Sequence, residues 1–324
     1  MTGRSWVSTV VATLALAAPW PQASAQPYPS KPVHIIVPNP AGGTTDLLAR
    51  MLARGLQAQT GQQAIVENRP GAAGLTAAAA VARSPGDGYT LFMTNKGPVT
   101  ILPAFRRETP YDPETFSAIS MTISMPFYMI VNARLGVRNV KDFVALAKTR
   151  PNAIFYGSTG VGGPSHLLTE QFAEQTGVRL KHIPYQGGPQ AFASLIAGET
   201  DLFFSVPSTA LAHLKDKEAT FLGVLSQTRT AEAPDVATIG EQGLEGFEAG
   251  AWFGLLGPPG MQDDMKARLR EIMSKSFSDA EARNVIDKLG AVFVADSPAD
   301  FARTVKADLA RWRNLAARIN LSLD

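Results

Sequence analysis

Short apolar runs alternate with helical patterns along most of the chain. Residues 34–37, 63–67 and 89–94 are apolar runs that predict strands. Between the first two runs, apolar residues recur at spacings of three and four, which predicts a helix: Leu47, Leu48, Met51, Leu52 and Leu56. The alanine-rich stretch 75–83 predicts a second helix. This β-α-β-α-β order is typical of a parallel sheet with helices on its faces.

A second series of the same kind begins near Phe127. Its predicted strands are 127–131, 153–157, 180–185, 201–205 and 221–226, and its predicted helices are 140–149, 165–175 and 188–198. From Ala251 a strand leads to helices at 262–276, 279–289 and 298–319, with a strand at 291–295.

The two series predict an α/β fold of two domains. Residues 26–125 and 249–324 would form domain 1, and residues 126–248 would form domain 2. The chain would cross between them near Met125–Val131 and near Phe247–Leu255. We therefore expect a hinge of two crossing strands, with a ligand cleft between the domains.

Composition sets the class of protein. The chain has 324 residues, 45% of them hydrophobic, which is enough for one large or two ordinary domains. Its net charge is +2 and its charges are interspersed, so we expect no nucleic-acid partner. There is no cysteine, which excludes disulfides, zinc–cysteine sites and thiol nucleophiles.

The pattern of the first 25 residues predicts a secretory signal peptide. Arg4 gives a positive start, Val7–Ala18 is apolar, and residues 23–25 fit the small-x-small cleavage pattern, with cleavage after Ala25. The alternative is a membrane anchor. The apolar run is too short for it, because spanning about 30 Å of hydrocarbon takes roughly 20 residues.

Two glycine-rich turns join a predicted strand to a predicted helix, one in each domain: PNPAGGTTDLLAR (38–50) and YGSTGVGGPSHLL (156–168). A helix start leaves backbone N–H groups unpaired, and glycine lets an anion approach them closely. Each helix end stabilises a nearby negative charge by about 0.3–1 kcal/mol. Two such turns facing across a cleft would hold a ligand with anionic or polar ends. The alternative is that each turn only caps its own helix, through Thr44, Thr45 or Ser165.

Asp46 and His166 follow the two turns, and we expect both to brace them. A carboxylate beside an anion site would repel the ligand, whereas the helix dipole favours it in the first helical turn. Direct ligand contact by Asp46 is the alternative. His166 opens a helix, and we expect it to be a hydrogen-bonded structural residue rather than a catalytic base.

Two other strand ends supply candidate side chains. TNKGP (94–98) follows the third strand, so Thr94, Asn95 and Lys96 would point into the same cleft. Lys96 either pairs with a ligand carboxylate or is solvated. YQGG (185–188) follows a strand of the second domain and is a third candidate wall.

The chain does not match the known motifs for cofactor binding or catalysis. Residues 160–165 nearly fit the dinucleotide fingerprint, but Ser165 replaces the third glycine and a proline interrupts it. No GxSxG elbow surrounds Ser158, and the four histidines lack metal-ligand spacing. We therefore expect no cofactor, no metal and no enzyme activity. A hydrolase using Ser158 and His166 is the alternative, and it lacks an evident orienting acid.

These motifs resemble those of the tripartite tricarboxylate transporter receptors (TctC), also called Bordetella uptake gene (Bug) solute-binding proteins. Seven segments follow in family order over nearly all of the mature chain: YPSKPVHIIVPNPAGGTTDLLAR, VENRPGAAG, DGYTL, YGSTGVGGPSHL, IPYQGG, the run from Arg229 to Gly243, and ADSPADF. The resemblance implies a two-domain periplasmic-binding-protein fold that closes on a small solute.

The resemblance also implies a function. Relatives bind acidic amino acids, di- and tricarboxylates, nicotinate and aromatic acids. We expect a periplasmic, monomeric receptor that delivers a small-molecule carboxylate to the membrane components of a tripartite tricarboxylate transporter. The alternative is a receptor that presents its liganded form to a membrane signalling partner.

The ligand-binding residues that the resemblance and the loops imply come from four segments: Asn39, Ala41, Gly42, Gly43, Thr44 and Thr45; Asn95; Ser158, Thr159, Gly160, Gly162, Gly163 and Ser165; and Tyr185 and Gly187. Two positions depart from the family pattern. Asn39 stands where relatives often have phenylalanine, and Gly163 stands where they often have a hydroxyl residue. Both changes affect which acid would fit.

Overall fold

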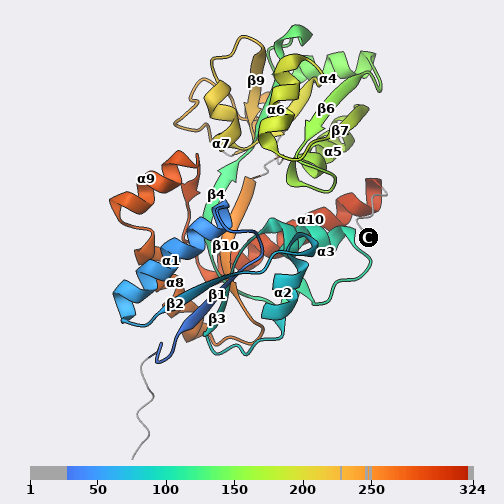
Figure 1. The fold of residues 1–324 in the computed structure, drawn as a ribbon. Coiled ribbons are helices and arrows are strands. Elements are labelled where there is room, and N and C mark those ends of the chain that lie inside the picture. The colour runs from blue at the N-terminus through green and yellow to red at the C-terminus, as the bar shows by residue number, and fades with distance from the viewer. Residues whose placement is uncertain (1–27, 227, 245–246, 248–249, 320–324) are drawn as a thin grey trace, which may run out of the picture.

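The computed structural model describes residues 28–226, 228–244, 247 and 250–319. The predicted signal peptide lies outside them. In this described part, no helix combines the length and apolar character needed to cross a membrane. The chain forms two lobes, each built on its own sheet (Figure 1). We call residues 28–126 and 250–319 lobe 1, and residues 127–226, 228–244 and 247 lobe 2.

Lobe 1 contains a six-stranded sheet of order β11-β4-β10-β3-β1-β2. Its elements are β1 (Val33–Val37), α1 (Thr44–Thr60), β2 (Ala64–Asn68), η1 (Ala72–Gly74), α2 (Leu75–Ala82), β3 (Thr90–Asn95), η2 (Gly97–Ile101), α3 (Leu102–Phe105), η3 (Pro113–Thr115), β4 (Ser117–Pro126), β10 (Gly250–Gly257), α8 (Asp263–Ser276), α9 (Ala280–Lys288), β11 (Val292–Phe293) and α10 (Pro298–Ile319). The predicted helices and strands of this half are therefore present, although the strand expected at 291–295 has only two residues.

Lobe 2 contains a five-stranded sheet of order β7-β6-β8-β5-β9. Its elements are β5 (Tyr128–Asn132), η4 (Ala133–Leu135), α4 (Val140–Thr149), β6 (Ile154–Ser158), α5 (Pro164–Thr176), β7 (Leu180–Pro184), α6 (Gly188–Ala197), β8 (Leu202–Ser205), α7 (Pro207–Ala210), η5 (Leu211–His213), β9 (Ala219–Val224) and η6 (Gly240–Gln242). The α/β architecture predicted from the sequence is confirmed.

Both sheets are mixed, which the βαβ pattern did not indicate. The pairs β1–β2 and β1–β3 are parallel, as predicted. Strand β10 returns from the far end of the chain and pairs antiparallel with β3 and β4. In lobe 2, β6 is parallel to β7 and β8, whereas β5 is antiparallel to β8 and β9. The reversed strands in both sheets are next to the crossings between the lobes.

Strand β4 was missing from the sequence prediction, which began the second series at Phe127. The strand has ten residues, and hydroxyl residues interrupt its apolar run. Ser120 and Thr122 are nevertheless fully buried. Ser120 donates to the carbonyl of Asp296, and the Thr122 hydroxyl lies 3.3 Å from the sulfur of Met273. Partners distant in the sequence satisfy these polar groups, so the local pattern did not reveal the strand.

The hinge prediction is confirmed. Strand β4 ends at Pro126 and β5 begins at Tyr128, so a single residue separates the two sheets. On the return, β10 begins at Gly250, directly opposite Pro126 in the β4–β10 pair. The described ends of the two crossings, Pro126 and Gly250, therefore lie side by side, and Figure 1 shows β4 and β10 as neighbouring strands. The domain boundaries at 125/126 and 248/249 stay a prediction.

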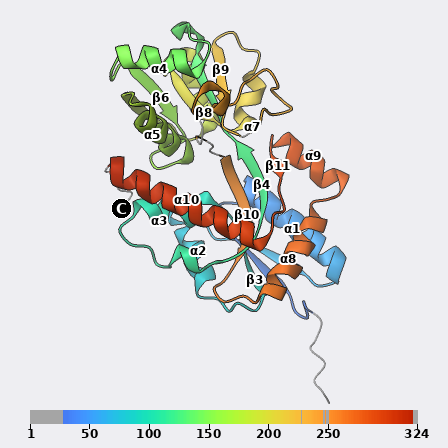
Figure 2. The ribbon, with the colours of Figure 1, turned by 180° about the vertical axis from the view of Figure 1, so that it is seen from behind.

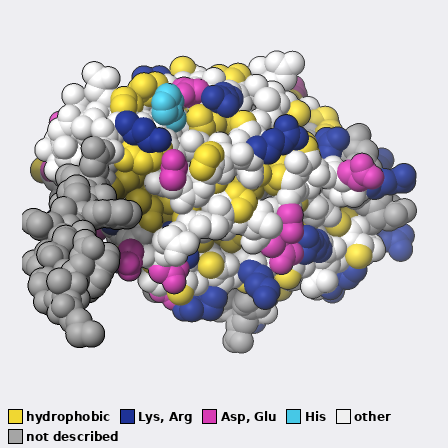
Figure 3. Space-filling view, turned by 90° about the horizontal axis from the view of Figure 1, so that it is seen from below, with side chains coloured by type: hydrophobic (Ala, Val, Ile, Leu, Met, Phe, Trp, Pro, Cys, Tyr) yellow, Lys and Arg dark blue, Asp and Glu magenta, His cyan; other side chains and the backbone are white. Residues whose placement is uncertain are grey.

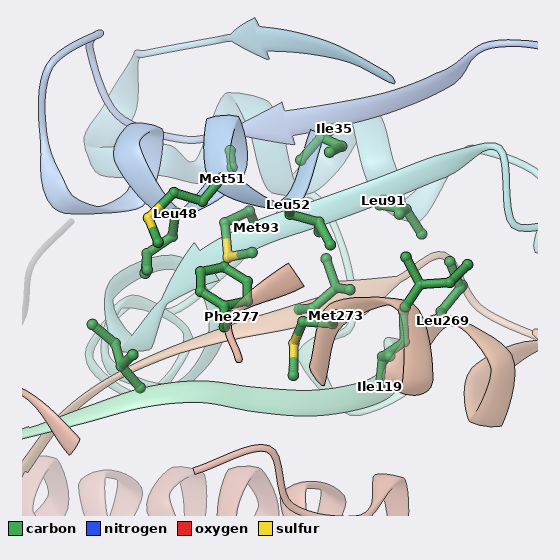
Figure 4. Packing of buried hydrophobic residues seen from close by; sticks show 14 of the residues in the cluster. Ile35, Leu48, Met51, Leu52, Leu91, Met93, Ile119, Leu269, Met273 and Phe277 are labelled. Atoms are coloured by element: carbon green, nitrogen blue, oxygen red, sulfur yellow. The ribbon is translucent and has the colours of Figure 1, made fainter. Parts of the chain in front are cut away.

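Helix α1 packs its predicted apolar face into the core of lobe 1. Leu48, Met51 and Leu52 are buried, and Figure 4 shows them facing Met93 of β3 and Phe277. The spacing of three and four places these side chains on one side of the helix. This packing fixes the helix axis, and with it the position of the glycine-rich turn at its start.

Helix α10 belongs to lobe 1 but also touches lobe 2. It crosses the back of lobe 1 and approaches α5 (Figure 2). Leu167 of α5 packs in one cluster with Trp312 and Leu315 of α10. One turn further, Arg318 lies 3.3 Å from Glu174. The C-terminal helix therefore adds a third connection between the lobes.

We predict that Gly254→Ala destabilises the fold. A Cβ at Gly254 of β10 would lie 2.3 Å from the ring of Phe301, which is fully buried in α10. Overpacking of this kind costs about 1–3 kcal/mol. Urea unfolding should show this loss in the free energy of unfolding. The matched control is Gly240→Ala, whose Cβ meets nothing closer than 3.7 Å. Equal stability of the two variants would contradict the prediction.

Candidate functional site

The first glycine-rich turn joins β1 to α1. Gly43 is the N-cap, and no side chain caps the helix. Gly42 has φ +89°, a conformation that favours glycine, and its N–H donates to Oδ2 of Asp46 at 2.9 Å. Asp46 is itself bound by Arg50 through both carboxylate oxygens, at 2.9 and 3.0 Å. The hydrogen bonds from Arg50 are the main reason that the pKa of Asp46 is lowered.

The second turn, between β6 and α5, repeats this geometry. Gly163 is the N-cap, again without a side-chain cap. Gly162 has φ +73°, and its N–H donates to Nδ1 of His166 at 3.0 Å. In both turns a side chain four residues along the chain holds the glycine that precedes the N-cap. An imidazole in lobe 2 thus does what a carboxylate does in lobe 1.

Each turn also contains a hydrogen bond between residues six positions apart. The hydroxyl of Thr45 donates to Oδ1 of Asn39 at 3.0 Å. In lobe 2, the N–H of Thr159 donates to the hydroxyl of Ser165 at 2.9 Å. The hydroxyl groups of Thr45 and Ser165 are therefore engaged in hydrogen bonds within the turns. The alternative in which Thr44, Thr45 or Ser165 caps its helix is therefore wrong.

The helix starts keep unpaired backbone donors. The first regular helical bonds run from Leu47 N–H to Gly43 and from Leu167 N–H to Gly163. The N–H groups of Thr44, Thr45 and Ser165 therefore precede the first bond, and the described part of the chain offers them no partner. Such groups, together with the helix dipole, favour an anion.

A cavity of about 400 Å³ lies between the lobes, and both turns contribute to it. Five of the predicted site residues line it: Asn39, Thr44, Asn95, Thr159 and Ser165. The cavity also has an apolar wall from the hinge, α10 and β8: Met125, Phe127, Trp252, Phe253, Trp312, Phe203 and Phe204. It therefore combines polar groups from the two turns with a largely aromatic surface.

Ten predicted residues do not line this cavity: Ala41, Gly42, Gly43, Thr45, Ser158, Gly160, Gly162, Gly163, Tyr185 and Gly187. Thr45 and Ser158 are buried behind the turns. Ala41, Gly42 and Gly43 are exposed at the first turn. The third predicted wall, at 185–188, contributes only Gly188.

Lys96 is not solvated, which was one of the two roles considered for it. It is buried, and its Nζ lies 3.0 Å from Oδ2 of Asp308 in α10. Burial lowers the pKa of Lys96 to about 8, and Asp308 opposes this shift. The same Asp308 oxygen accepts from the indole N–H of Trp252 at 2.8 Å. The lysine thus ties the end of β3 to α10, and its charge is paired at the cavity wall.

A stack of three rings lies behind the second turn. The rings of His166 and His182 are 4.0 Å apart, and Tyr156 stacks on His182 at 4.8 Å. Burial lowers the pKa of His166 to about 4 and is the main reason that the pKa of His182 falls to about 4. The sequence did not indicate that His182 would join this group, because it lies on a different strand.

The contact of Ser158 differs from the one considered in the hydrolase alternative. Its hydroxyl lies 2.6 Å from Nε2 of His182, not on His166, and the serine is fully buried. The hydroxyl also accepts from the N–H of Gly160 at 3.1 Å. A buried serine engaged in its own turn lacks the access that a nucleophile needs. Among the described residues, no cluster of three or more His, Cys, Asp or Glu side chains could hold a metal.

Several cavity residues were absent from the predicted site. Trp252 and Phe253 lie on the strand predicted from Ala251, which carries no site motif, and Trp312 lies on a helix far along the chain. Ser208 and Thr209 line the cavity just after β8. The rule used for Asn95, that residues after a strand face the cleft, would have found Ser208 and Thr209. No local signal marked the aromatic residues.

Comparison with known proteins identifies the family. The profile of the tripartite tricarboxylate transporter family receptor matches residues 48–321. The chain belongs to this family. The receptor is 30% identical to protein BugT of Bordetella pertussis over 319 residues, which are 98% of this chain and 97% of BugT. The resemblance stated from the sequence motifs is therefore confirmed.

Solved structures show the same fold. A TctC solute-binding protein from Polaromonas, without ligand, is 27% identical to the receptor, with a TM-score of 0.81 over 90% of this chain and 99% of that chain. An R. palustris protein solved with adipate is 31% identical, with a TM-score of 0.73 over 91% of this chain and 99% of that chain. The receptor thus has the two-lobed fold of periplasmic binding proteins.

We predict that His166→Asn makes the stability of the receptor less sensitive to acid. His166 must be neutral to accept from Gly162, and its folded pKa of about 4 lies below the ordinary value of roughly 6.5. The unfolded chain therefore takes up a proton first as the pH falls. The stability that neutral His166 contributes is complete above about pH 6.5 and is lost toward about pH 4.

Urea unfolding over this pH range measures the effect. The oxygen of asparagine takes the place of Nδ1 but does not titrate, so the fall in free energy of unfolding should be shallower than in the parent. His182 still titrates in both proteins. Parallel pH profiles for parent and variant would show that His166 does not have the depressed pKa.

Proposed function

We propose that this receptor binds a small organic carboxylate between its two glycine-rich turns in the periplasm and delivers it to a tripartite tricarboxylate-type transporter. The observation that carries the proposal is the paired geometry of the turns. Each turn braces a glycine with a side chain four residues on and leaves helix-start N–H groups unpaired. The cavity between them is about 400 Å³, which suits a small ligand.

The charges of the cavity support an anionic ligand. No Asp or Glu occurs among its described lining residues, and the lining cation, Lys96, is paired with Asp308. The ligand would therefore be held by backbone and amide or hydroxyl donors. The relative solved with adipate supports the same class of ligand.

Some predicted residues do not line the cavity and stay in the proposal as residues that shape the turns. We infer that Gly42 and Gly162 have this role instead of ligand contact, and that Asp46 and His166 keep the bracing role expected for them. Because Gly43 has no side chain, the first turn of α1 would be open to the ligand. Closure of the lobes about the paired β4 and β10 ends would bring Thr159 and Ser165 toward Asn39 and Thr44, in the manner of periplasmic binding proteins.

The cellular setting is also proposed. Export rests on the signal-peptide pattern that ends at Ala25, and we expect a monomer. The partners would be a small carboxylate and the membrane components of the transporter, not nucleic acid. On the face seen in Figure 3, basic and acidic side chains are interspersed, which agrees with this. A role in presenting the liganded form to a signalling partner is the second candidate, and a pull-down with and without ligand would separate the two.

We predict that the receptor binds at least one acid from a panel of di- and tricarboxylates, acidic amino acids and aromatic acids. A ligand present at 100 times its Kd adds about 2.7 kcal/mol to the free energy of unfolding. For a protein of this size, the unfolding midpoint should rise by several degrees. Thermal shift followed by isothermal titration checks this. Absence of binding across the whole panel would count decisively against a carboxylate receptor.

We also predict that Gly43→Val weakens binding at least tenfold while the fold is kept. Gly43 has φ −82°, which valine adopts, and a Cβ there meets only the carbonyl of Pro40 at 3.8 Å. The branched side chain would obstruct the helix start. Gly160 is a poorer test, because its φ of +123° would strain any side chain.

The control for Gly43→Val is Gly240→Val, an open glycine in η6 away from the cavity. Both variants should have unfolding midpoints near that of the parent, and only Gly43→Val should lose affinity in isothermal titration. If Gly43→Val bound the selected acid as tightly as the parent, ligand approach to this turn would be excluded.

A further inference from the structure

We propose that Asn39 turns its amide NH₂ into the cavity and makes the lobe 1 end of the site a hydrogen-bond donor surface, so that the ligand is an organic acid without an ammonium group. The inference rests on the proposed function and narrows it. It concerns this chain's own side chains at the first turn: Asn39, its neighbour Asn95, and the groups that contact them.

The orientation of the Asn39 amide follows from a chain of hydrogen bonds that begins at the backbone. The N–H of Gly97 can only donate, and it lies 2.9 Å from one side-chain atom of Asn95. That atom must be Oδ1, so the other atom of the Asn95 amide is Nδ2. Nδ2 of Asn95 donates at 3.1 Å to Asn39, and the receiving atom must be Oδ1 of Asn39. The NH₂ group of Asn39 therefore points the other way.

A second donor supports this orientation. The hydroxyl of Thr45 also donates to Oδ1 of Asn39, at 3.0 Å. Two donors occupy the oxygen, whereas Nδ2 of Asn39 has no partner in the described part of the chain. Asn39 is half-buried and lines the cavity. Its two amide hydrogens are thus available to a ligand.

The acceptors around Asn39 are already in use. Its own carbonyl accepts from Nδ2 of Asn68 at 3.1 Å. The nearest carboxylate along the chain, Asp46, accepts from Gly42 and from Arg50, and it is buried. What this end of the cavity offers is therefore donors: the Asn39 NH₂ and the unpaired N–H of Thr44.

Donors without a charged acceptor beside them discriminate between ligand groups. A carboxylate that leaves water here regains hydrogen bonds to the Asn39 NH₂ and to Thr44. An ammonium group would leave water and find only neutral acceptors such as the Thr44 hydroxyl at this end, and no acidic side chain lines the rest of the described cavity to balance its charge. An α-amino acid should therefore bind more weakly than the acid that has hydrogen in place of the amino group.

Three matched pairs of ligands test the proposal on the intact mature protein: succinate against L-aspartate, glutarate against L-glutamate, and adipate against L-2-aminoadipate. Isothermal titration at neutral pH should show binding of at least one diacid, with its amino counterpart at least tenfold weaker. An amino acid that binds as tightly as its diacid would overturn the inference, while the carboxylate receptor would stand.

Two substitutions test the role of Asn39, with the tightest of the six acids as the probe. Asn39→Asp keeps the oxygen that Asn95 and Thr45 need but replaces the NH₂ with a second oxygen. Asn39→Ala removes the NH₂ without adding charge. Both substitutions should weaken binding of the diacid at least tenfold, and Asn39→Asp should weaken it more than Asn39→Ala. Asn314→Asp adds the same charge at an exposed position of α10 and should bind like the parent.

The outcomes separate the two proposals. Parent-like affinity in Asn39→Ala overturns the inference alone, provided that the variant unfolds near the midpoint of the parent. If all six acids fail to bind, the acid that the wider panel selects is compared with its α-amino counterpart, and equal affinity of the two overturns the inference. The wider panel of acids decides the proposed function independently.

Discussion

The candidate site depends on one hydrogen bond that occurs twice. In each lobe, the N–H of a glycine with positive φ donates to a side chain four residues further on, Asp46 in lobe 1 and His166 in lobe 2. The bond closes the turn into a fixed shape, and the following helix then begins at a glycine without a side-chain cap. Because no capping side chain occupies the helix start, its N–H groups stay free. A turn that satisfied its helix internally would have no donors left for a solute.

The other constraint is the buried charge beneath the cavity. Lys96 and Trp252 both contact Asp308, which joins β3, the hinge strand β10 and helix α10. This arrangement pairs the lining lysine with a carboxylate and directs the indole N–H of Trp252 to the same carboxylate. The cavity has an apolar hinge side and polar turns. Removing one member of such a buried pair costs more than the pair contributes, because the other charge is left unsatisfied.

Some elements of the fold follow from local sequence patterns, and others depend on contacts between distant residues. The stripe of Leu48, Met51 and Leu52 predicted α1 correctly, because a helical period survives whatever the helix packs against. Strand β4 was missed because Ser120 and Thr122 are satisfied by residues more than a hundred positions away. The aromatic wall was missed for a related reason. Trp252 and Trp312 look like ordinary core residues until the lobes and α10 are assembled around them.

The sequence by itself determined the two α/β series, the hinge near residue 126, the pair of glycine-rich turns and, through its motifs, the family. Each of these follows from residues close together in the chain, since helix periods, strand runs and turns are local. Only the tertiary structure decided which turn residues reach the cavity, that Lys96 is paired with Asp308, and that His182 rather than His166 contacts Ser158. It also decided the orientation of the Asn39 amide, because the hydrogen bond that fixes it begins at Gly97, on another strand end brought alongside by the sheet.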